Sequence, residues 1–156
     1  MPANSAPPDT ARPLDDLHVV VIGESIAAAV VGMTLGDFGA DVLLVEPPSG
    51  SRLRAAPAWT SWSRALRTED VDLTTDAGRA RITDIAETAD VALVALEPAT
   101  ADHLGVDGPT LCVSNPRLVH CEVTGFGRGH PLSDVPGHDA LVSCAAGRAY
   151  EFGVIF

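Results

Sequence analysis

The chain has 156 residues, of which 46% are hydrophobic, and its 21 acidic against 10 basic residues give a net charge of −11 at pH 7. A chain of this length forms about one domain with a sizeable core, whereas its acidity argues against nucleic acid or an anionic membrane as partner, since both attract clustered cations. All ten cations are arginine, so chemistry that needs a lysine, such as a P-loop phosphate contact or a Schiff base, is excluded for this chain.

The first thirteen residues, MPANSAPPDTARP, are small, polar and rich in proline. Such a composition cannot bury enough apolar surface to fold, so residues 1–13 are expected to form a disordered leader. They lack the basic start and apolar stretch of a signal peptide, and no window approaches the roughly 18 apolar residues of a membrane span. The sequence therefore predicts a cytoplasmic protein with no membrane partner.

The first predicted element is a buried strand in LHVVVIG, residues 17–23, a continuous apolar run that ends at glycine. A helix is expected next over IAAAVVGMTLGDF, because Ser25 can cap its start and Gly39 stands where a left-handed C-terminal cap is usual. DVLLVE, residues 41–46, predicts a second buried strand, stopped by Pro47-Pro48. A strand–helix–strand unit of this kind is typical of a right-handed crossover between parallel strands.

After an irregular segment over residues 49–68, strands and helices alternate again. The expected elements are a short strand in DVDLT (70–74), a helix over 77–88 capped by Asp76, a buried strand in DVALVAL (90–96), a short helix near 99–104, a turn at 105–109 and a last strand over 118–123. This alternation predicts one α/β domain over residues 14–147, Rossmann-like, with a mostly parallel sheet and helices on both faces.

In a sheet of this class, ligands bind outside the carboxyl ends of the strands. The segments expected there are 23–27, 46–48, 97–99 and 124–129, the last of which is the glycine-rich stretch TGFGRG. Glycines let a backbone approach a ligand closely, although the same composition also suits an ordinary flexible connection.

The turn GESIAAA could be interpreted as a dinucleotide site, with Glu46 as the acid that binds the ribose. Its fingerprint should read G-x-G-x-x-G, but only Gly23 is present, and the charge of Glu24 would repel a pyrophosphate. A dinucleotide-binding Rossmann domain is therefore the least favoured function.

His138 and Asp139 follow Pro136-Gly137 shortly after the glycine-rich stretch. A helix that starts near Pro136 would hold Asp139 in its first turn and His138 at its rim. An imidazole suits proton transfer near neutral pH, although a solitary histidine is more often structural or exposed.

No metal site is expected in the chain. The cysteines lie in or near apolar runs without C-x-x-C spacing, which predicts reduced core thiols at Cys112, Cys121 and Cys144. The remaining histidines show no metal-ligand spacing with one another or with the cysteines: His18, His103, His120 and His130.

Six ordered segments resemble the amino-terminal part of class III (CaiB/BaiF-type) coenzyme A transferases, a family that includes formyl-CoA transferase, carnitine CoA-transferase and α-methylacyl-CoA racemase. The segments are PLDDLHVVVIG, LGDFGADVLLVEPPSG, DVDLTTDAGRARI, ADVALVALEPATADHLGV, NPRLVHCEVTGFGRGHP and DVPGHDAL. The resemblance runs from about Pro13 to Gly147. It implies a Rossmann-like domain that binds coenzyme A and, in complete members, interlaced dimers.

The resemblance also implies roles for individual residues. His138 would exchange the proton α to an acyl-CoA thioester, as in the racemase branch, with Asp139 orienting it or the adjacent loop. In the transferase branch, an aspartate further along the chain attacks the acyl-CoA and forms a mixed anhydride. Coenzyme A would contact Ser25, Ile26 and Ala27 after the first strand, Gly125, Phe126 and Gly127 in the glycine-rich stretch, and Arg64 and Arg67 through its phosphates.

Several positions depart from the family pattern. Pro47 and Leu66 stand where relatives carry basic residues, and Glu97 stands in place of an arginine. Each lost charge-assisted contact removes about 1.5–3 kcal/mol, so we expect coenzyme A to bind weakly or not at all. The chain ends before the family's aspartate and small domain, which predicts an isolated chain that is inactive, although descended from enzymes acting on acyl-CoA.

The expected partner is a second copy, giving a homodimer, or a chain that supplies the carboxy-terminal part. An alternative is a non-catalytic interaction or dimerisation module that docks through residues 148–156, a tail that does not resemble the family.

Overall fold

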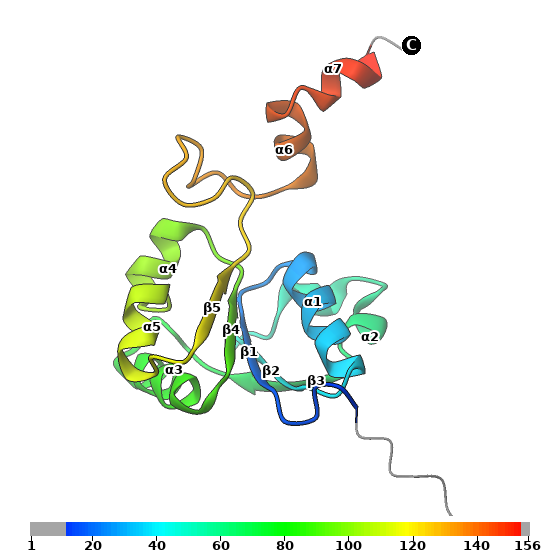
Figure 1. Cartoon of the computed structure of the whole chain (residues 1–156). Helices are drawn as coiled ribbons and strands as arrows, with labels where there is room; N and C mark the ends of the chain where they lie inside the picture. Colours follow the sequence, from blue (N-terminus) through cyan, green and yellow to red (C-terminus); the bar gives the residue numbers. More distant parts are fainter. Residues whose placement is uncertain (1–11, 154–156) are drawn as a thin grey trace, which may run out of the picture.

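Five parallel strands form a single sheet in the order β3-β2-β1-β4-β5 (Figure 1). The computed structural model describes residues 12–153, so the expected disordered leader lies almost entirely outside the described residues. The strands are β1 (His18–Ile22), β2 (Asp41–Glu46), β3 (Leu66–Asp70), β4 (Val91–Val94) and β5 (Val119–Glu122). The central strand β1 pairs with both β2 and β4, with Val20 opposite Leu43 and Ala92. The expected α/β fold with a parallel sheet is confirmed.

Helices lie on both faces of the sheet (Figure 1). On one face are α1 (Ile26–Asp37) and α2 (Trp59–Trp62), and on the other are α3 (Asp76–Thr88), α4 (Pro98–Leu104) and α5 (Gly108–Ser114). The last two helices, α6 (Asp139–Ala145) and α7 (Arg148–Gly153), project away from the sheet. Within residues 12–153, no helix is long and apolar enough to cross a membrane.

The core is divided between the two faces because side chains alternate along each strand. In β1, Val20 and Ile22 belong to the cluster under α3, α4 and α5, whereas Val19 and Val21 belong to the cluster under α1. All four are at most 2% exposed. Burying a side chain of this size stabilises a fold by about 1.5–3 kcal/mol, which explains why the central strands are continuous apolar runs.

The third strand lies four residues earlier than the sequence predicted. The expected strand over residues 70–74 is wrong, because β3 spans Leu66–Asp70 and contains mostly polar residues. It is an edge strand, and its charged side chains form ion pairs with neighbouring elements, Arg67 with Asp41 and Glu69 with Arg81. Its stability therefore does not depend on an apolar run that the sequence could reveal.

Two helix starts also differ from expectation. The turn over residues 105–109 includes the left-handed Gly105 but gives way to α5 at Gly108, where Asp107 caps the helix by accepting a hydrogen bond from the Thr110 backbone at 3.0 Å. In α3 the capping side chain is Thr75, which accepts from the Gly78 backbone at 3.0 Å, and Asp76 lies in the first turn. The segment over residues 49–68, expected to be irregular, contains α2 and the short 3-10 helix η1 (Arg52–Ala55).

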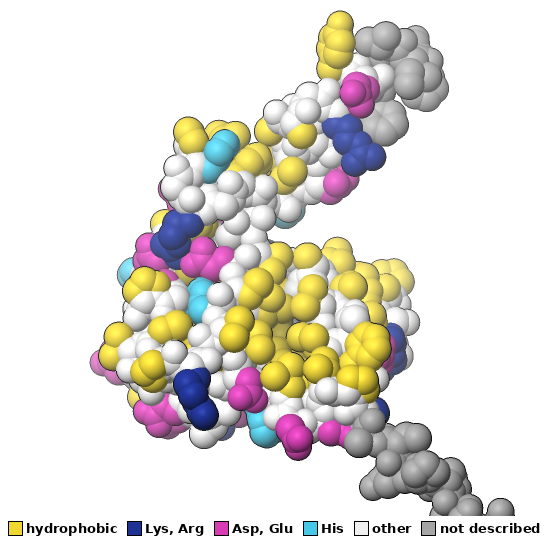
Figure 2. Space-filling view, viewed as in Figure 1, with side chains coloured by type: hydrophobic (Ala, Val, Ile, Leu, Met, Phe, Trp, Pro, Cys, Tyr) yellow, Lys and Arg dark blue, Asp and Glu magenta, His cyan; other side chains and the backbone are white. Residues whose placement is uncertain are grey.

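The cysteines are free thiols, but only one of them packs against the core. Cys112 lies beside the cluster under α5, whereas Cys121 and Cys144 are exposed, which corrects the expectation of three core thiols. Cys121 is exposed because it belongs to β5 on the α1 side of the sheet, where hydrophobic side chains gather at the surface (Figure 2). Exposed residues of α1 and β5 include Ile26, Val31 and Val119, at 53%, 39% and 60%.

Candidate functional site

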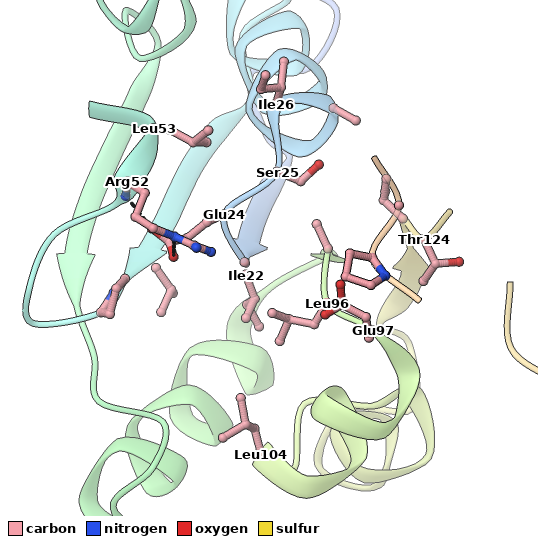
Figure 3. A pocket seen from close by; sticks show the side chains of 18 of the residues that line it. Ile22, Glu24, Ser25, Ile26, Arg52, Leu53, Leu96, Glu97, Leu104 and Thr124 are labelled. Atoms are coloured by element: carbon pink, nitrogen blue, oxygen red, sulfur yellow. Dashed lines mark hydrogen bonds and ion pairs between the residues drawn. The ribbon is translucent and has the colours of Figure 1, made fainter. Parts of the chain in front are cut away.

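A cavity of about 1130 Å³ opens at the carboxyl ends of the strands. Each strand contributes the residues that follow it or end it, namely 22–27, 45–47, 71–74, 95–97 and 123–125. Arg52 and Leu53 of η1 form a further wall (Figure 3). The segment before α6 also contributes lining residues. The cavity lies where the strand order reverses around β1 and β4, which is where a doubly wound sheet binds its ligand.

The amino-terminal end of α1 forms one wall of this cavity. Ser25, Ile26 and Ala27 line it, as expected from the sequence. Ser25 occupies the N-cap position, but its side chain makes no capping hydrogen bond. The first N–H groups of a helix lack partners within the helix and carry partial positive charge, so this wall suits a negatively charged or strongly polar group.

Gly23 connects β1 to this wall through a backbone conformation that suits glycine. Its φ is +106°, and a Cβ added there would lie 2.4 Å from the carbonyl oxygen of Ala95 at the end of β4. The two strand ends therefore approach so closely that a side chain does not fit between them. Gly23 and Ala95 both line the cavity, as do their chain neighbours Ile22 and Leu96 (Figure 3).

Glu24 and Arg52 form an ion pair on the opposite side of the cavity from Thr124 (Figure 3). The backbone N–H of Arg52 donates to Glu24 Oε1 at 2.5 Å, and Arg52 Nε donates to Glu24 Oε2 at 3.1 Å. The pair ties the loop after β1 to η1. The negative charge of Glu24, expected to repel a pyrophosphate, thus has a cation beside it.

The charged groups on the cavity wall are mostly acidic. The described lining residues with charged side chains are Glu24, Glu46, Asp72, Glu97, Asp139 and Arg52. Glu46 is 1% exposed, and it accepts hydrogen bonds from the Ser51 backbone at 3.3 Å and from Arg54, a pairing that raises the pKa of Arg54. A ribose hydroxyl would have to displace these donors from Glu46, which argues against a dinucleotide site.

The glycine-rich stretch is braced by its own side chains. The Gly127 backbone N–H donates to Thr124 Oγ1 at 2.9 Å. The rings of Phe126 and His130 stack, with their centroids 5.7 Å apart. Arg128 pairs with Glu122 of β5 and with Asp102 of α4, and these hydrogen bonds raise the pKa of Arg128. Thr124 and Gly125 line the cavity, whereas Phe126 and Gly127 lie outside its lining.

Two glycines bring His138 and Asp139 to this cavity. A Cβ on Gly125 would lie 2.5 Å from the Cα of Gly137, and a Cβ on Gly137 would lie 2.8 Å from the backbone nitrogen of Gly125. Residue 137 is followed directly by His138, the N-cap residue of α6, and by Asp139 in its first turn. The helix start expected near Pro136 is thus present, and both residues, which are exposed, line the cavity.

The structure does not bring Arg64 and Arg67 to the cavity. Arg64 pairs with Asp37 at the end of α1 and donates to the Ser61 carbonyl at 2.8 Å. Arg67 Nε donates to Asp41 Oδ1 at 2.7 Å, and this contact lowers the pKa of Asp41. Asp41 begins β2, so Arg67 lies toward the amino ends of the strands, away from the cavity.

Sequence reasoning missed the cavity residues Arg52, Leu53 and 71–74. The turn residues Pro47, Pro48 and Gly50 after β2 could have indicated Arg52 and Leu53, because they predict that the chain reverses at the carboxyl end of the sheet. No group of three metal-ligating side chains occurs in the part of the chain that the structure describes.

Comparisons with known proteins give one family and several relatives. The model of CoA-transferase family III matches residues 14–153. The chain is 31% identical over 156 residues to the succinate–glutarate CoA-transferase of Agrobacterium fabrum, covering 90% of this chain and 39% of that protein. It is 32% identical over 155 residues to the beta subunit of the succinyl-CoA–L-malate CoA-transferase of Chloroflexus aurantiacus, covering 93% and 38%.

A solved structure has the same fold. The crystal structure of Rv3272 from Mycobacterium tuberculosis matches with a TM-score of 0.82 and 34% sequence identity, over 88% of this chain and 39% of that chain. The chain therefore spans about two fifths of the length of the relatives it matches.

Proposed function

The chain belongs to CoA-transferase family III, and from this membership we propose that its cavity receives the thioester end of an acyl-CoA. One observation carries the proposal: the start of α1, the first two residues of the glycine-rich stretch (Thr124 and Gly125) and His138 all line the same cavity. The start of α1 and the glycine-rich stretch supply backbone polar groups to the cavity, and His138 supplies an imidazole that can accept a proton. A thioester carbonyl needs polar groups of this kind, and the carbon beside it needs a base.

In this proposal His138 is the acid/base. A ring nitrogen of neutral His138 would take the proton from the carbon α to the thioester, and the electron pair of the broken C–H bond would form an enolate, stabilised by resonance. Return of the proton from the imidazolium to the same carbon regenerates the neutral imidazole and completes the exchange. Asp139 would act as a positioning residue, because a carboxylate in the first turn of α6 stabilises the helix that begins beside His138.

Transfer between carboxylic acids would need an additional residue. This chain spans about two fifths of its relatives' length, so we propose that a nucleophilic aspartate comes from a polypeptide that carries the carboxy-terminal part of the family. The chain alone is then expected to show no CoA transfer.

The exposed apolar surface of α1 and β5 supports association of the chain with a second copy (Figure 2). An isolated surface of Ile26, Val31 and Val119 would remain in contact with water at a cost of about 25 cal/mol per Å² of apolar area. We expect sedimentation equilibrium at micromolar concentration to give a dimer. The variant Val119→Glu should be a monomer whose unfolding free energy is similar to that of the unaltered chain. If the unaltered chain is itself a monomer, the proposed association is contradicted.

Isothermal titration with acetyl-CoA tests the ligand. We expect weak binding, with a Kd on the order of 1 mM, because five acidic side chains line the cavity beside a single arginine among the described residues. Micromolar affinity would contradict the expectation of a weakened phosphate site. NAD serves as the control, and a rise in melting temperature with NAD would instead favour a dinucleotide-binding domain.

A further inference from the structure

Arg52 is the cation best placed to meet the phosphates of a ligand in the cavity. It lines the cavity, and its side chain is 88% exposed. The cations expected in this role, Arg64 and Arg67, are held by carboxylates outside the cavity. Among the described lining residues, Arg52 is thus the one arginine that a ligand phosphate could contact directly.

Glu24 determines how available Arg52 is. Its carboxylate is only 21% exposed, and both of its oxygens accept hydrogen bonds from Arg52, one from the backbone N–H and one from Nε. An exposed guanidinium gains little from such a pair because water screens the attraction. A phosphate offers more negative charge and a bidentate geometry, so it would compete well for the guanidinium.

The position of Glu24 adds a second effect on phosphate binding. Glu24 directly precedes Ser25, the N-cap residue of α1. The Glu24 carboxylate also lies beside the guanidinium of Arg52, so a phosphate that approached Arg52 would meet a fixed negative charge there. Repulsion at this range weakens the contact between the phosphate and Arg52.

We propose that Arg52 contacts the phosphates of the coenzyme A moiety and that Glu24 lowers the affinity by holding Arg52 and repelling those phosphates. The inference rests on the proposed function, since it assumes that acyl-CoA occupies the cavity. Glu24 and Arg52 would thus determine the affinity for the phosphate-bearing half of the ligand, without changing the affinity for its thioester half.

The test compares acetyl-CoA with acetyl-pantetheine, which has the same thioester and no phosphate. Glu24→Gln keeps an oxygen that can accept from the Arg52 backbone, so η1 stays attached while the charge is lost. We expect this variant to bind acetyl-CoA about tenfold more tightly, equivalent to about 1.4 kcal/mol, with no change for acetyl-pantetheine. Arg52→Gln should weaken the binding of acetyl-CoA but not that of acetyl-pantetheine. The double variant should not show the tighter acetyl-CoA binding of Glu24→Gln.

Asp37→Asn and Arg64→Gln are the matched controls, because they remove the same charges from a pair outside the cavity. Both should leave the acetyl-CoA affinity unchanged, and unfolding in urea verifies that every variant is folded. Equal tightening of both ligands, or a tenfold gain in Asp37→Asn, would overturn the inference. If acetyl-pantetheine binds but Glu24→Gln does not improve acetyl-CoA binding, this inference alone fails. If neither ligand binds any variant, the proposed function fails with it.

Discussion

Substitution of Gly23 by alanine is expected to lower the free energy of unfolding by about 3 kcal/mol, through positive-φ strain and overpacking together. The added Cβ would lie 2.4 Å from the carbonyl oxygen of Ala95, at a position where φ is +106°. The oxygen belongs to backbone at the end of β4 and cannot rotate away. Separation of β1 from β4 would relieve the contact, but β1 is the central strand of the sheet and β4 is paired on both sides.

Comparing the unfolding free energies of Gly23→Ala and Gly127→Ala, measured in urea, isolates the steric part of this effect. Gly127 also has a positive φ, +79°, but a Cβ added there meets nothing within 4 Å. Strain alone should cost Gly127→Ala about 1 kcal/mol. If both variants lose the same unfolding free energy, the ends of β1 and β4 leave room for a Cβ and the steric argument fails.

The second large effect is expected at Gly125, where alanine should weaken acetyl-pantetheine binding at least about tenfold, since small misplacements of site residues are costly. A Cβ at Gly125 would lie 2.5 Å from the Cα of Gly137, so the two segments must separate. Separation moves His138 and Asp139 away from the cavity. The unfolding free energy should change little, because this contact lies outside both clusters of the core.

Gly129→Ala is the control for this substitution, since it lies in the same glycine-rich stretch with no atom near its added Cβ. Its affinity for acetyl-pantetheine should match that of the unaltered chain. Undiminished binding by Gly125→Ala would mean that the contact between the two glycines does not position the site.

The sequence predicted the central part of the fold because burial on both faces leaves a local signal. The strands β1, β2, β4 and β5 each lie within an expected apolar run, and Gly39 after α1 has the expected positive φ. The strand β3 was misplaced, because an edge strand stabilised by ion pairs has no such run. The exposure of Cys121 was also missed, because a sequence does not show which face of β5 is left uncovered.

The cavity was predicted in part for a similar reason. Segments that follow buried strands meet at one edge of a parallel sheet, so residues 25–27 and 125 could be expected there. Residues 138–139 were expected at the site only from the resemblance to the family. The charges could not be assigned in this way. Glu24 and Arg52 are 28 residues apart, and the pairs of Arg64 with Asp37 and of Arg67 with Asp41 span 27 and 26 residues. Which arginine faces a ligand depends on such long-range pairs.

The account depends most on one claim, that the cavity at the carboxyl ends of the strands is where the acyl-CoA thioester binds. Backbone amide chemical shifts measured during titration with acetyl-pantetheine test it directly. We expect the largest changes at residues 23–27, 124–125 and 137–139, which line the cavity, and small changes around Arg67 and His18 at the amino ends of the strands. Changes concentrated at that opposite edge, or no changes at millimolar ligand, would contradict the claim.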